Sequence, residues 1–562
     1  MGMMAFAPGL ARGPPGRRQG AGRNRCTTCM STVTILDYGA GNVRSLENAL
    51  RRLGHDFKWA QTPEDILSAE KLIFPGVGSF GAAMENLDSK NFSEPLAEYL
   101  RQDRPYLGIC LGLHCLFDGS EESPEIDGLG IIDGTITKIL PSPGLSVPHM
   151  GWNTLSPKRG SVLLKGVEYE RFYFVHSFRL EESEHCLSET VHGSPFVSVV
   201  QRGNLFATQF HPEKSGEAGL RLIDNFISSS DLASPMSLPA AKDSVNRGLA
   251  KRIVACLDVR ENDQGDLVVT KGDQYDVRET AGDREVRNLG KPVALAGRYF
   301  DEGADEVTFL NITSFRGEPL GDAPMLQVLE RSSEGVFVPL CIGGGIRDYE
   351  DSNGVSYTAL EVAARYFRAG ADKVSIGSDA VYAAEKFIES GKFEGSSIGA
   401  ISFVYGAQAV VVSIDPKRVY VSSPEDTDHV TTRAQQKGPN GEEYCWYQCT
   451  VKGGREARDI DVVQLATSVE SMGAGEILLN CMDADGTNAG YDLPLIKMVS
   501  SAVSIPVIAS SGAGVPEHFV ECFNETGVEA ALAAGIFHRK EVSIKEVKDT
   551  VVTNGIPVRV TD

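Results

Sequence analysis

The residues most able to do chemistry are a cysteine between glycines and a histidine closely followed by a glutamate. Cys110 lies in the run Gly108-Ile109-Cys110-Leu111-Gly112, and His211-Pro212-Glu213 follows much later in the chain. Isolated cysteines are most often small buried apolar residues. Here, however, a histidine could deprotonate the thiol, and the glutamate could orient and charge-stabilise the imidazole. We therefore predict a cysteine nucleophile served by a His–Glu pair.

The segments around Cys110 would hold the thiol exposed. Residues 104–109 form a short apolar run typical of a strand, and residues 111–117 resemble the start of a helix. A nucleophile at such a strand-to-helix turn is presented to substrate, and the helix N-terminus favours a thiolate.

Further motifs surround these residues: Asp37-Tyr38-Gly39-Ala40-Gly41-Asn42, Phe74-Pro75-Gly76-Val77-Gly78, His149-Met150-Gly151-Trp152-Asn153, Tyr173-Phe174-Val175-His176-Ser177 and Gln209-Phe210-His211-Pro212-Glu213-Lys214-Ser215. Together they resemble the class I (triad) glutamine amidotransferases, and specifically the glutaminase half of the imidazole glycerol phosphate synthase family. The resemblance implies an α/β domain that hydrolyses glutamine, with Cys110, His211 and Glu213 as catalytic residues.

The same resemblance implies two sets of binding residues. Backbone N–H groups of Gly76, Val77 and Gly78 would stabilise the tetrahedral oxyanion of amide hydrolysis. Glutamine would be held by His114, Glu122, His176, Ser177 and Phe178. The family usually has glutamine where this chain has His114. Because histidine can still donate one hydrogen bond, we expect glutamine to bind. Without the resemblance, Glu122 would be interpreted as a solvated residue.

Length and composition predict two domains and exclude several classes of partner. A chain of 562 residues is too long for one core, and 59 glycines suit an α/β architecture with many tight turns. No apolar stretch reaches the roughly 20 residues needed to cross a membrane. A net charge of −22 argues against nucleic acid and anionic lipid as partners. Eleven cysteines without two pairs at metal-ligand spacing indicate reduced thiols inside a cell, with no metal and no cofactor.

The first 31 residues differ from the rest. They have no acidic residue and five arginines: Arg12, Arg17, Arg18, Arg23 and Arg25. No apolar segment follows, so a secretory signal is disfavoured, and the composition suits an organellar transit peptide or a disordered tail. Resemblance to plant-type bifunctional enzymes favours a plastid peptide, with the cytoplasm as the other possible location. We therefore expect a transit peptide or disordered tail at 1–31, a glutaminase domain at 32–228, a linker at 229–248 and a barrel at 249–562.

The second domain alternates short apolar runs with helical patterns, which predicts a parallel sheet of βα units. The runs are Ile253–Asp258, Glu306–Ile312, Val338–Ile342, Lys373–Ile376, Ala409–Asp415, Glu476–Met482, Pro506–Ser510 and Ala530–Ile536. Eight such strands match a (β/α)₈ TIM barrel.

The last four runs resemble the first four, which implies an internal two-fold repeat. Asp258 and Asp415 then end the first and fifth strands, facing one another across the catalytic mouth. Two such carboxylates could divide the roles of acid and base, although each could instead cap a helix. Glycine turns after the third and seventh strands, and small residues ending the fourth and eighth, could each cradle a phosphate.

From Lys251 to His538 the chain resembles the cyclase of the same family. The resemblance implies a substrate with two phosphates, N′-[(5′-phosphoribulosyl)formimino]-5-aminoimidazole-4-carboxamide ribonucleotide (PRFAR). Ammonia would convert it to imidazole glycerol phosphate and aminoimidazole carboxamide ribotide (AICAR), with Asp258 and Asp415 as the acid–base pair. PRFAR and its phosphates would be bound by Lys271, Gly344, Gly345, Gly377, Ser378, Asn480, Asp485, Gly486, Ser511, Gly512, Ala534 and Gly535. Residues 416–454 form a long insertion without an assigned function.

Free ammonia would be mostly protonated in water near pH 7, so the two activities need a sheltered route between them. Charged residues of alternating sign begin four strands at the face opposite the phosphate loops, and in the family such a ring gates the entry of ammonia: Arg252, Glu306, Lys373 and Glu476. They could instead be surface residues flanking the strands. We expect the glutaminase domain to dock on this face within one monomeric chain, with glutamine and PRFAR as its small-molecule partners.

Two alternative functions fit part of these observations. The barrel could catalyse a phosphoribosyl isomerisation, because the isomerase that makes PRFAR shares a duplicated half-barrel with opposed aspartates. Alternatively, His114 could mark a catalytically silent sensor of metabolites. The cysteine triad and the charged ring argue against an isomerase, which needs no ammonia.

Overall fold

The computed structural model describes residues 32–39, 42–241, 247–261, 267–269, 291–312, 324–391 and 395–561. These residues belong to one compact unit. The proposed transit peptide at 1–31 and the predicted substrate residue Lys271 lie outside the described residues.

The N-terminal part of the chain builds an eight-stranded sheet of order β2-β1-β3-β4-β13-β12-β11-β8. Its first five strands pair in parallel: β2 (Phe57–Ala60), β1 (Val33–Leu36), β3 (Lys71–Phe74), β4 (Tyr106–Ile109) and β13 (Leu205–Thr208). The other three continue in antiparallel fashion: β12 (Ser194–Arg202), β11 (Cys186–His192) and β8 (Ser156–Pro157).

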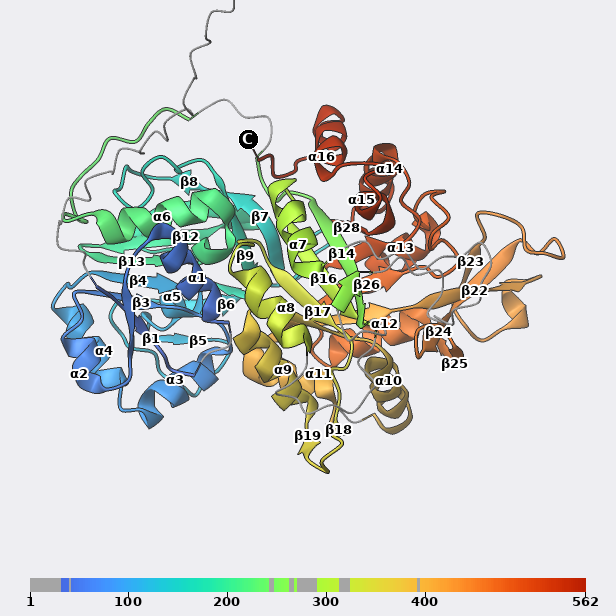
Figure 1. Cartoon of the computed structure of the whole chain (residues 1–562), viewed down its shortest axis with the longest axis horizontal. Helices are drawn as coiled ribbons and strands as arrows, with labels where there is room; N and C mark the ends of the chain where they lie inside the picture. The colour runs from blue at the N-terminus through green and yellow to red at the C-terminus, as the bar shows by residue number, and fades with distance from the viewer. Residues whose placement is uncertain are drawn as a thin grey trace, which may run out of the picture. The chain divides into compact units, whose positions relative to one another are not determined.

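Helices cover both faces of this sheet (Figure 1). One face packs against α1 (Arg44–Leu53) and α6 (Gly216–Ser228), and the other against α2 (Pro63–Leu67), α3 (Phe80–Ser89) and α4 (Ser93–Arg101). The strands are apolar on both faces. On β3, Ile73 joins the first layer, whereas Leu72 and Phe74 join the second. This two-residue alternation explains why the strands read as continuous apolar runs.

Smaller elements surround the main sheet. The ribbon of β7 (His149–Thr154) and β9 (Arg171–His176) pairs in antiparallel register from His149 opposite His176 to Thr154 opposite Arg171. A three-stranded sheet contains β5 (Gly119–Ser120), β6 (Thr135–Lys138) and β10 (Phe178–Arg179), and two short helices are α5 (Leu111–His114) and the 3₁₀ turn η1 (Pro212–Lys214).

The C-terminal part forms a closed parallel barrel, because the first barrel strand pairs with both the second and the last. Its strands are β14 (Arg252–Glu261), β16 (Glu306–Asn311), β17 (Leu340–Gly343), β20 (Lys373–Ile376), β21 (Val410–Ile414), β26 (Glu476–Asn480), β27 (Val507–Ser510) and β28 (Ala530–Ala533). Each predicted run overlaps one of these strands, so the predicted barrel is confirmed. A short extra strand, β15 (Leu267–Val269), pairs in antiparallel fashion with β14.

Helices follow the strands around the outside of the barrel. They are α7 (Pro292–Asp301), α8 (Pro324–Ser333), α9 (Ala359–Ala369), α10 (Ser378–Ser390), α11 (Ser397–Tyr405), α12 (Val462–Ser471), α13 (Leu493–Ala502), α14 (Pro516–Thr526), α15 (Gly535–His538) and α16 (Ile544–Thr553). The described residues also include the 3₁₀ turns η3 (Ala407–Ala409) and η4 (Pro424–Asp426). No helix within the described ranges combines the length and apolarity required to traverse a bilayer.

The inner face of the barrel explains how one strand can serve two sites. Along β14, Val254 and Cys256 join the apolar cluster inside the barrel, whereas Ile253, Ala255 and Leu257 join the outer cluster beneath the helices. The same two-residue period places Arg252 at one end of the interior and Asp258 at the other. Six residues of strand separate them by about 20 Å.

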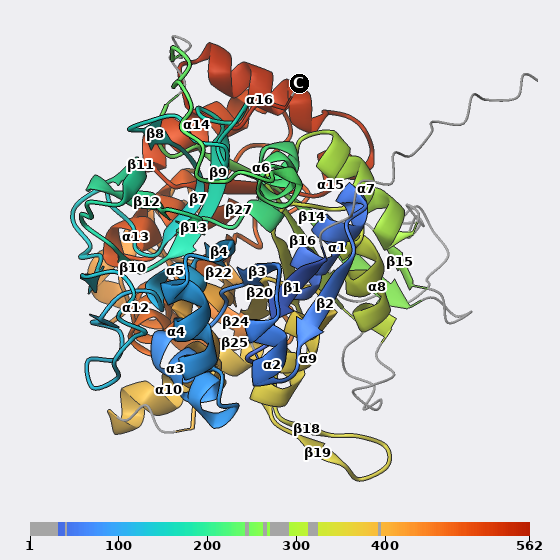
Figure 2. The same cartoon turned by 90° about the vertical axis from the view of Figure 1, so that its left-hand side faces the viewer.

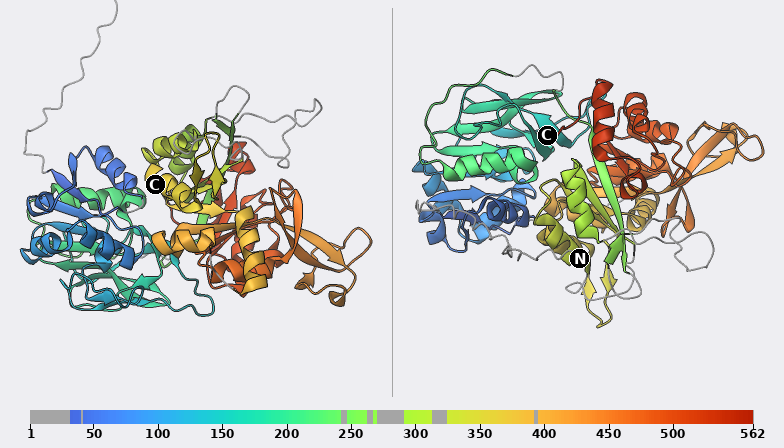
Figure 3. Two further views of the ribbon diagram at one scale, coloured as in Figure 1. Left: turned by 90° about the horizontal axis from the view of Figure 1, so that it is seen from below. Right: turned by 45° about the horizontal axis from the view of Figure 1, so that its top comes forward.

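The long insertion forms an antiparallel sheet of its own (Figure 3). Its strands are β22 (Pro416–Val421), β23 (Thr431–Arg433) and β24 (Tyr444–Val451), and β25 (Glu456–Asp461), just beyond the predicted end of the insertion, completes the sheet. Thr450 donates a hydrogen bond of 2.6 Å from its hydroxyl to the backbone oxygen of Asp415. A small hairpin of β18 (Tyr349–Glu350) and β19 (Ser356–Tyr357) projects from the barrel between β17 and α9 in the chain (Figure 2).

Candidate active sites

Cys110 occupies a constrained turn at the end of β4. Its φ of 50° and ψ of −98° lie outside the usual helix and strand regions, and it is 8% exposed. A Cβ added to Gly76 would lie 2.1 Å from the backbone oxygen of Ile109. Glycine at that position therefore lets the loop after β3 pack directly against the cysteine turn.

The helix after Cys110 is shorter than the sequence predicts. α5 ends at His114, because the next amide groups of Leu116 and Phe117 bond to carbonyls only three residues back. A single helical turn aligns few peptide dipoles. Activation of the thiol therefore depends mainly on the side chains around it.

His211 and Glu213 are buried and bonded to one another. His211 Nδ1 lies 2.8 Å from Glu213 Oε1, so the Nδ1 hydrogen is directed at the carboxylate. His211 also lines one cavity with Cys110, which is the second group acting on the imidazole. Burial opposes its charge, but the Glu213 carboxylate and the thiol together raise the pKa of His211 well above its usual value. This arrangement suits an imidazolium beside a thiolate.

The predicted oxyanion segment has its central amide occupied. The backbone N–H of Val77 donates to the Tyr38 hydroxyl at 3.2 Å. Gly78 has a φ of 129°, and a Cβ there would lie 3.3 Å from the backbone oxygen of Val404 on α11. Contacts from both domains therefore hold this segment, and Val77 must lose its bond to Tyr38 before its N–H can face an oxyanion.

The predicted glutamine-binding side chains of His114 and Glu122 already have protein partners. His114 is buried, and its Nε2 lies 3.0 Å from Gln209 Oε1. Glu122 accepts a hydrogen bond of 2.9 Å from the backbone N–H of Phe80, and burial raises its pKa. Glu122 is thus partly buried and accepts a hydrogen bond, so it is not a freely solvated acid.

The segment from His176 to Phe178 is fixed by its imidazole. His176 Nδ1 lies 2.8 Å from the Phe178 carbonyl, to which it must donate, which leaves Nε2 to accept from His149 Nδ1 at 3.0 Å. Burial lowers the pKa of both imidazoles far below its usual value, which keeps them neutral. Because both ring nitrogens are used, the His176 imidazole has no nitrogen left to bind a ligand in this arrangement.

A cavity of about 520 Å³ extends from the thiol into the barrel domain. Besides Cys110 and His211, its lining includes residues of the oxyanion segment, of β9 and of the barrel: Gly76, Val77, Gly78, Tyr173, Val175, Lys214, Asp372, Lys373, Tyr405, Gln408 and Ala409. Lys214 and Asp372 form an ion pair of 2.6 Å at its margin. The cavity therefore connects the triad to Lys373 of the predicted ring.

The ring residues are brought together at the near end of the barrel. Lys373 Nζ lies 2.7 Å from Glu306 Oε2 and 2.5 Å from Glu476 Oε2, and Arg252 contacts the same two carboxylates. All four side chains are at most 1% exposed. Two cations and two anions alternate, which offsets the cost of removing them from water. The interpretation of these residues as a solvated surface is wrong.

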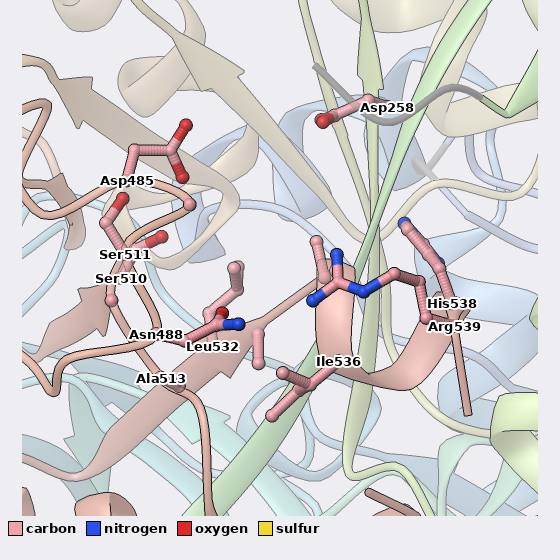
Figure 4. Close-up of a pocket in the computed structure, with 15 residues that line it drawn as sticks. Asp258, Asp485, Asn488, Ser510, Ser511, Ala513, Leu532, Ile536, His538 and Arg539 are labelled. Atoms are coloured by element: carbon pink, nitrogen blue, oxygen red, sulfur yellow. The ribbon is translucent and has the colours of Figure 1, made fainter. Parts of the chain in front are cut away.

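The far end of the barrel carries a second cavity of about 630 Å³ (Figure 4). Its lining includes seven residues that the sequence predicts for catalysis or substrate binding: Asp258, Asp485, Gly486, Ser511, Gly512, Ala534 and Gly535. Burial and the nearby Asp485 charge raise the pKa of Asp258 to about 7. Burial also raises the pKa of Asp415 to about 6, against a hydrogen bond of 3.2 Å from Asn480. Both carboxyls are thus poised near neutrality.

The predicted phosphate loops after β17 and β20 do not line that cavity, but their geometry follows the predicted two-fold repeat. Gly344 and Gly512 have φ of 94° and 96°, and a Cβ on either would lie about 2 Å from the backbone oxygen of Asn311 or Gly490, respectively. Gly345 also has positive φ, and Gly377 precedes α10. Ser378 Oγ accepts a hydrogen bond of 2.8 Å from the insertion residue Lys452.

Several residues that lie at these sites were not predicted from the sequence. Gln209 and Lys214 lie inside the histidine motif and could have been found from it. Tyr405 and Gln408 of the barrel reach the thiol cavity without any motif. His538 lines the barrel cavity at 7% exposure, and its Nε2 has no hydrogen-bond partner among the described residues. No cluster of metal-ligating side chains occurs within the described ranges.

Comparisons with known proteins agree with both halves. Residues 34–229 match the family described as glutamine amidotransferase class-I, and residues 252–543 match that described as histidine biosynthesis protein. The chain is 57% identical over 541 residues to the chloroplastic imidazole glycerol phosphate synthase hisHF of Arabidopsis thaliana, covering 95% of this chain and 90% of the relative. The hisHF proteins of Schizosaccharomyces pombe and Emericella nidulans are 55% and 52% identical, each covering 94% of this chain and 99% of the relative. Given these matches, the chain belongs to the family of bifunctional imidazole glycerol phosphate synthases.

Proposed function

We propose that Cys110, His211 and Glu213 hydrolyse glutamine to glutamate and ammonia. The Cys110 thiolate attacks the amide carbon, and the developing oxyanion is bound by backbone N–H groups of the segment from Gly76 to Gly78. His211 then protonates the leaving nitrogen, and ammonia departs from a thioester. Water, deprotonated by the same imidazole, hydrolyses the thioester and regenerates the thiol. Glu213 stabilises the imidazolium in both steps.

Ammonia released at Cys110 would enter the barrel through the ring of Arg252, Glu306, Lys373 and Glu476. The cavity beside the thiol is also lined by Lys373, so ammonia would pass from the thiol to the ring through this cavity. Since the ring is closed by its ion pairs, at least one side chain must move to let ammonia pass. The barrel interior beyond the ring is lined mainly by apolar side chains, which favours neutral ammonia over ammonium.

At the far end, Asp258 and Asp415 would convert PRFAR and ammonia to imidazole glycerol phosphate and AICAR. Both carboxyls have pKa values raised toward neutrality, so one can act as the general acid and the other as the general base. The loops after β17, β20, β27 and β28 would bind the two phosphates through backbone N–H groups. Asn480, which bonds Asp415, would orient that carboxylate.

The observation that carries this function is the shared cavity between the cysteine and the charged ring. The test supplies glutamine labelled with ¹⁵N in its amide together with PRFAR and excess unlabelled ammonium. We expect the new imidazole nitrogen to be mostly ¹⁵N, because ammonia passes directly between the sites. Label diluted to the isotopic composition of the medium would contradict a sheltered route.

The two alternatives predict different results with purified protein. An isomerase-type barrel would convert the precursor of PRFAR and leave PRFAR unchanged. A silent sensor would hydrolyse no glutamine, with or without PRFAR. Turnover of both glutamine and PRFAR would reject both alternatives.

We also propose the domain boundaries and the location suggested by the sequence: a glutaminase at 32–228, a linker at 229–248 and a cyclase at 249–562 in one monomeric chain. The basic residues before position 32 and the chloroplastic relative support import into plastids. A fusion of residues 1–31 to a fluorescent protein would test this by its location in plant cells.

A further inference from the structure

Gln209 makes a contact with the nucleophile that the triad leaves unexplained. Its side chain is fully buried, and its Nε2 donates to Cys110 Sγ at 3.6 Å. On its other side, its Oε1 lies 3.0 Å from His114 Nε2. A buried amide therefore connects the sulfur to His114, the position where this chain departs from its family's usual glutamine.

The orientation of this amide depends on His114. Burial lowers the pKa of His114 to about 4, so near neutral pH only one ring nitrogen carries hydrogen. If Nε2 carries it, His114 donates to Gln209 Oε1 and the amide NH₂ faces the sulfur. If Nδ1 carries it, Nε2 accepts and the amide must turn, presenting its carbonyl to the sulfur.

The two orientations have opposite effects on the nucleophile. An N–H group facing the sulfur stabilises the thiolate, as any donor to the charged form does. A carbonyl there would accept from the thiol and hold it protonated. The structure has the first orientation, which also favours departure of the thiolate when the thioester is hydrolysed.

We propose that Gln209 is a further catalytic residue that donates a hydrogen bond to the Cys110 thiolate, and that His114 is a positioning residue that keeps its amide in that orientation. This inference rests on the proposed role of Cys110 as nucleophile. It changes the role predicted for His114, which serves the sulfur through Gln209 instead of holding the glutamine substrate.

The test measures the pH dependence of Cys110 alkylation by iodoacetamide in the full-length protein. The modified peptide is identified by mass spectrometry, since the chain has eleven cysteines. Gln209→Met keeps the length of the side chain but removes the donor. We expect its midpoint to move to higher pH, with about tenfold slower alkylation at pH 7. Glutamine kcat should fall about tenfold, while KM stays within about twofold.

Variants at position 114 test the positioning role. His114→Leu should shift the alkylation profile in the same direction by less, because the freed amide samples both orientations. His114→Gln should largely restore it. The matched control is Thr208→Val, which removes a buried hydroxyl bonded at 2.9 Å to the Phe210 carbonyl, one residue away, without touching the sulfur. Its profile should equal that of the wild type.

Other outcomes overturn the proposal in distinct ways. An unchanged alkylation profile in Gln209→Met would remove Gln209 from catalysis. A raised KM for glutamine in His114→Leu, with the profile unchanged, would make His114 a substrate ligand. Ammonium-dependent turnover of PRFAR in each variant shows that the chain is folded. Absence of glutamine turnover in the wild type would instead refute the proposed function itself.

Discussion

The proposed cysteine centre and the proposed aspartate centre would serve one reaction sequence, but burial affects their titrating groups in different ways. At the cysteine, burial of His211 is outweighed by Glu213 and the thiol, so the imidazole keeps its charge. At the barrel mouth, burial raises the pKa of Asp258, and the charge of Asp485 raises it further, so this carboxyl is a weaker acid than usual. A site that stabilises an ion pair suits nucleophilic attack, whereas one that leaves acids near neutrality suits proton exchange.

The largest expected effect separates the two centres completely. Cys110→Ala should lower glutamine-dependent formation of imidazole glycerol phosphate by a factor of about 10³ or more, because the covalent route is lost. Ammonium-dependent formation at high pH should persist, since the barrel is untouched. Parallel product assays with the two nitrogen sources check this.

Cys115→Ala is the matched control, because Cys115 is a buried cysteine on the same turn with no assigned catalytic role. It should keep glutamine-dependent activity. Loss of both activities in Cys110→Ala would mean that the centres do not divide the labour.

A change at Asp258 should affect both activity and stability. Asp258→Asn should reduce cyclisation by about 10²–10⁴ with either nitrogen source, the usual contribution of general acid–base catalysis. It should also stabilise the fold at pH 8. A carboxyl pKa near 4 in the unfolded chain and about 7 in the folded one destabilises the fold progressively from pH 4 to 7. The largest gain is about 4 kcal/mol.

Thermal unfolding at pH 4 and pH 8 measures this gain. The variant should be more stable than the wild type only at pH 8. Equal melting temperatures at pH 8 would show that burial of the ionised Asp258 carboxylate does not destabilise the fold. Retained cyclisation would remove Asp258 from the acid–base pair.

Lys373→Met should disturb the connection between the centres. It leaves Glu306 and Glu476 with Arg252 as their cation in the ring, and breaking a buried ion pair costs about 3–5 kcal/mol. We expect a lower melting temperature and more glutamate than imidazole product per turnover, because ammonia escapes from a disordered ring. Quantifying both products measures the loss.

The double variant Lys373→Met with Glu306→Gln restores the balance of charge and serves as the control. It should recover stability relative to the single variant. If it does not, the packing of Lys373 matters more than its charge. If the two products stay equal in Lys373→Met, the ring does not control the route.

The barrel was predictable because its signals are local. Each strand is a short apolar run, and the repeat of Asp258 and Asp415 fixes which strand ends face the mouth. The inner position of Arg252 follows from the two-residue period of a strand. The predicted helix after Cys110 was too long, because side-chain patterns do not reveal where hydrogen bonds shorten to three residues.

Hydrogen-bond partners that come from distant segments of the chain could not be predicted from the sequence. The amide of Val77 bonds to Tyr38, and Gln209 bonds to His114, through folding that brings separate segments together. The reach of Tyr405 and Gln408 into the thiol cavity depends on how the two halves of the chain pack. The raised pKa values of Asp258 and Asp415 likewise depend on how deeply these carboxyls are buried, which the sequence does not specify.

The smallest expected effect concerns the pH dependence of cyclisation. If Asp415 is the base and Asp258 the acid, the active form has the first deprotonated and the second protonated. Activity then rises as pH passes about 6 and falls as it passes about 7. The charge of Asp485 raises both pKa values. Asp485→Asn should therefore move both limbs to lower pH, by up to about one unit.

The measurement is kcat/KM for PRFAR from pH 5 to 9, with the concentration of unprotonated ammonia kept constant so that the thiol is bypassed. Asp483→Asn is the matched control, since the Asp483 carboxylate accepts from the backbone N–H of Arg418 at 2.7 Å and is not among the charges acting on Asp258 or Asp415. Its profile should match the wild type. Limbs that stay in place in Asp485→Asn would mean that burial alone sets these carboxyls, whereas a shift to higher pH would contradict the assignment of charge at the mouth.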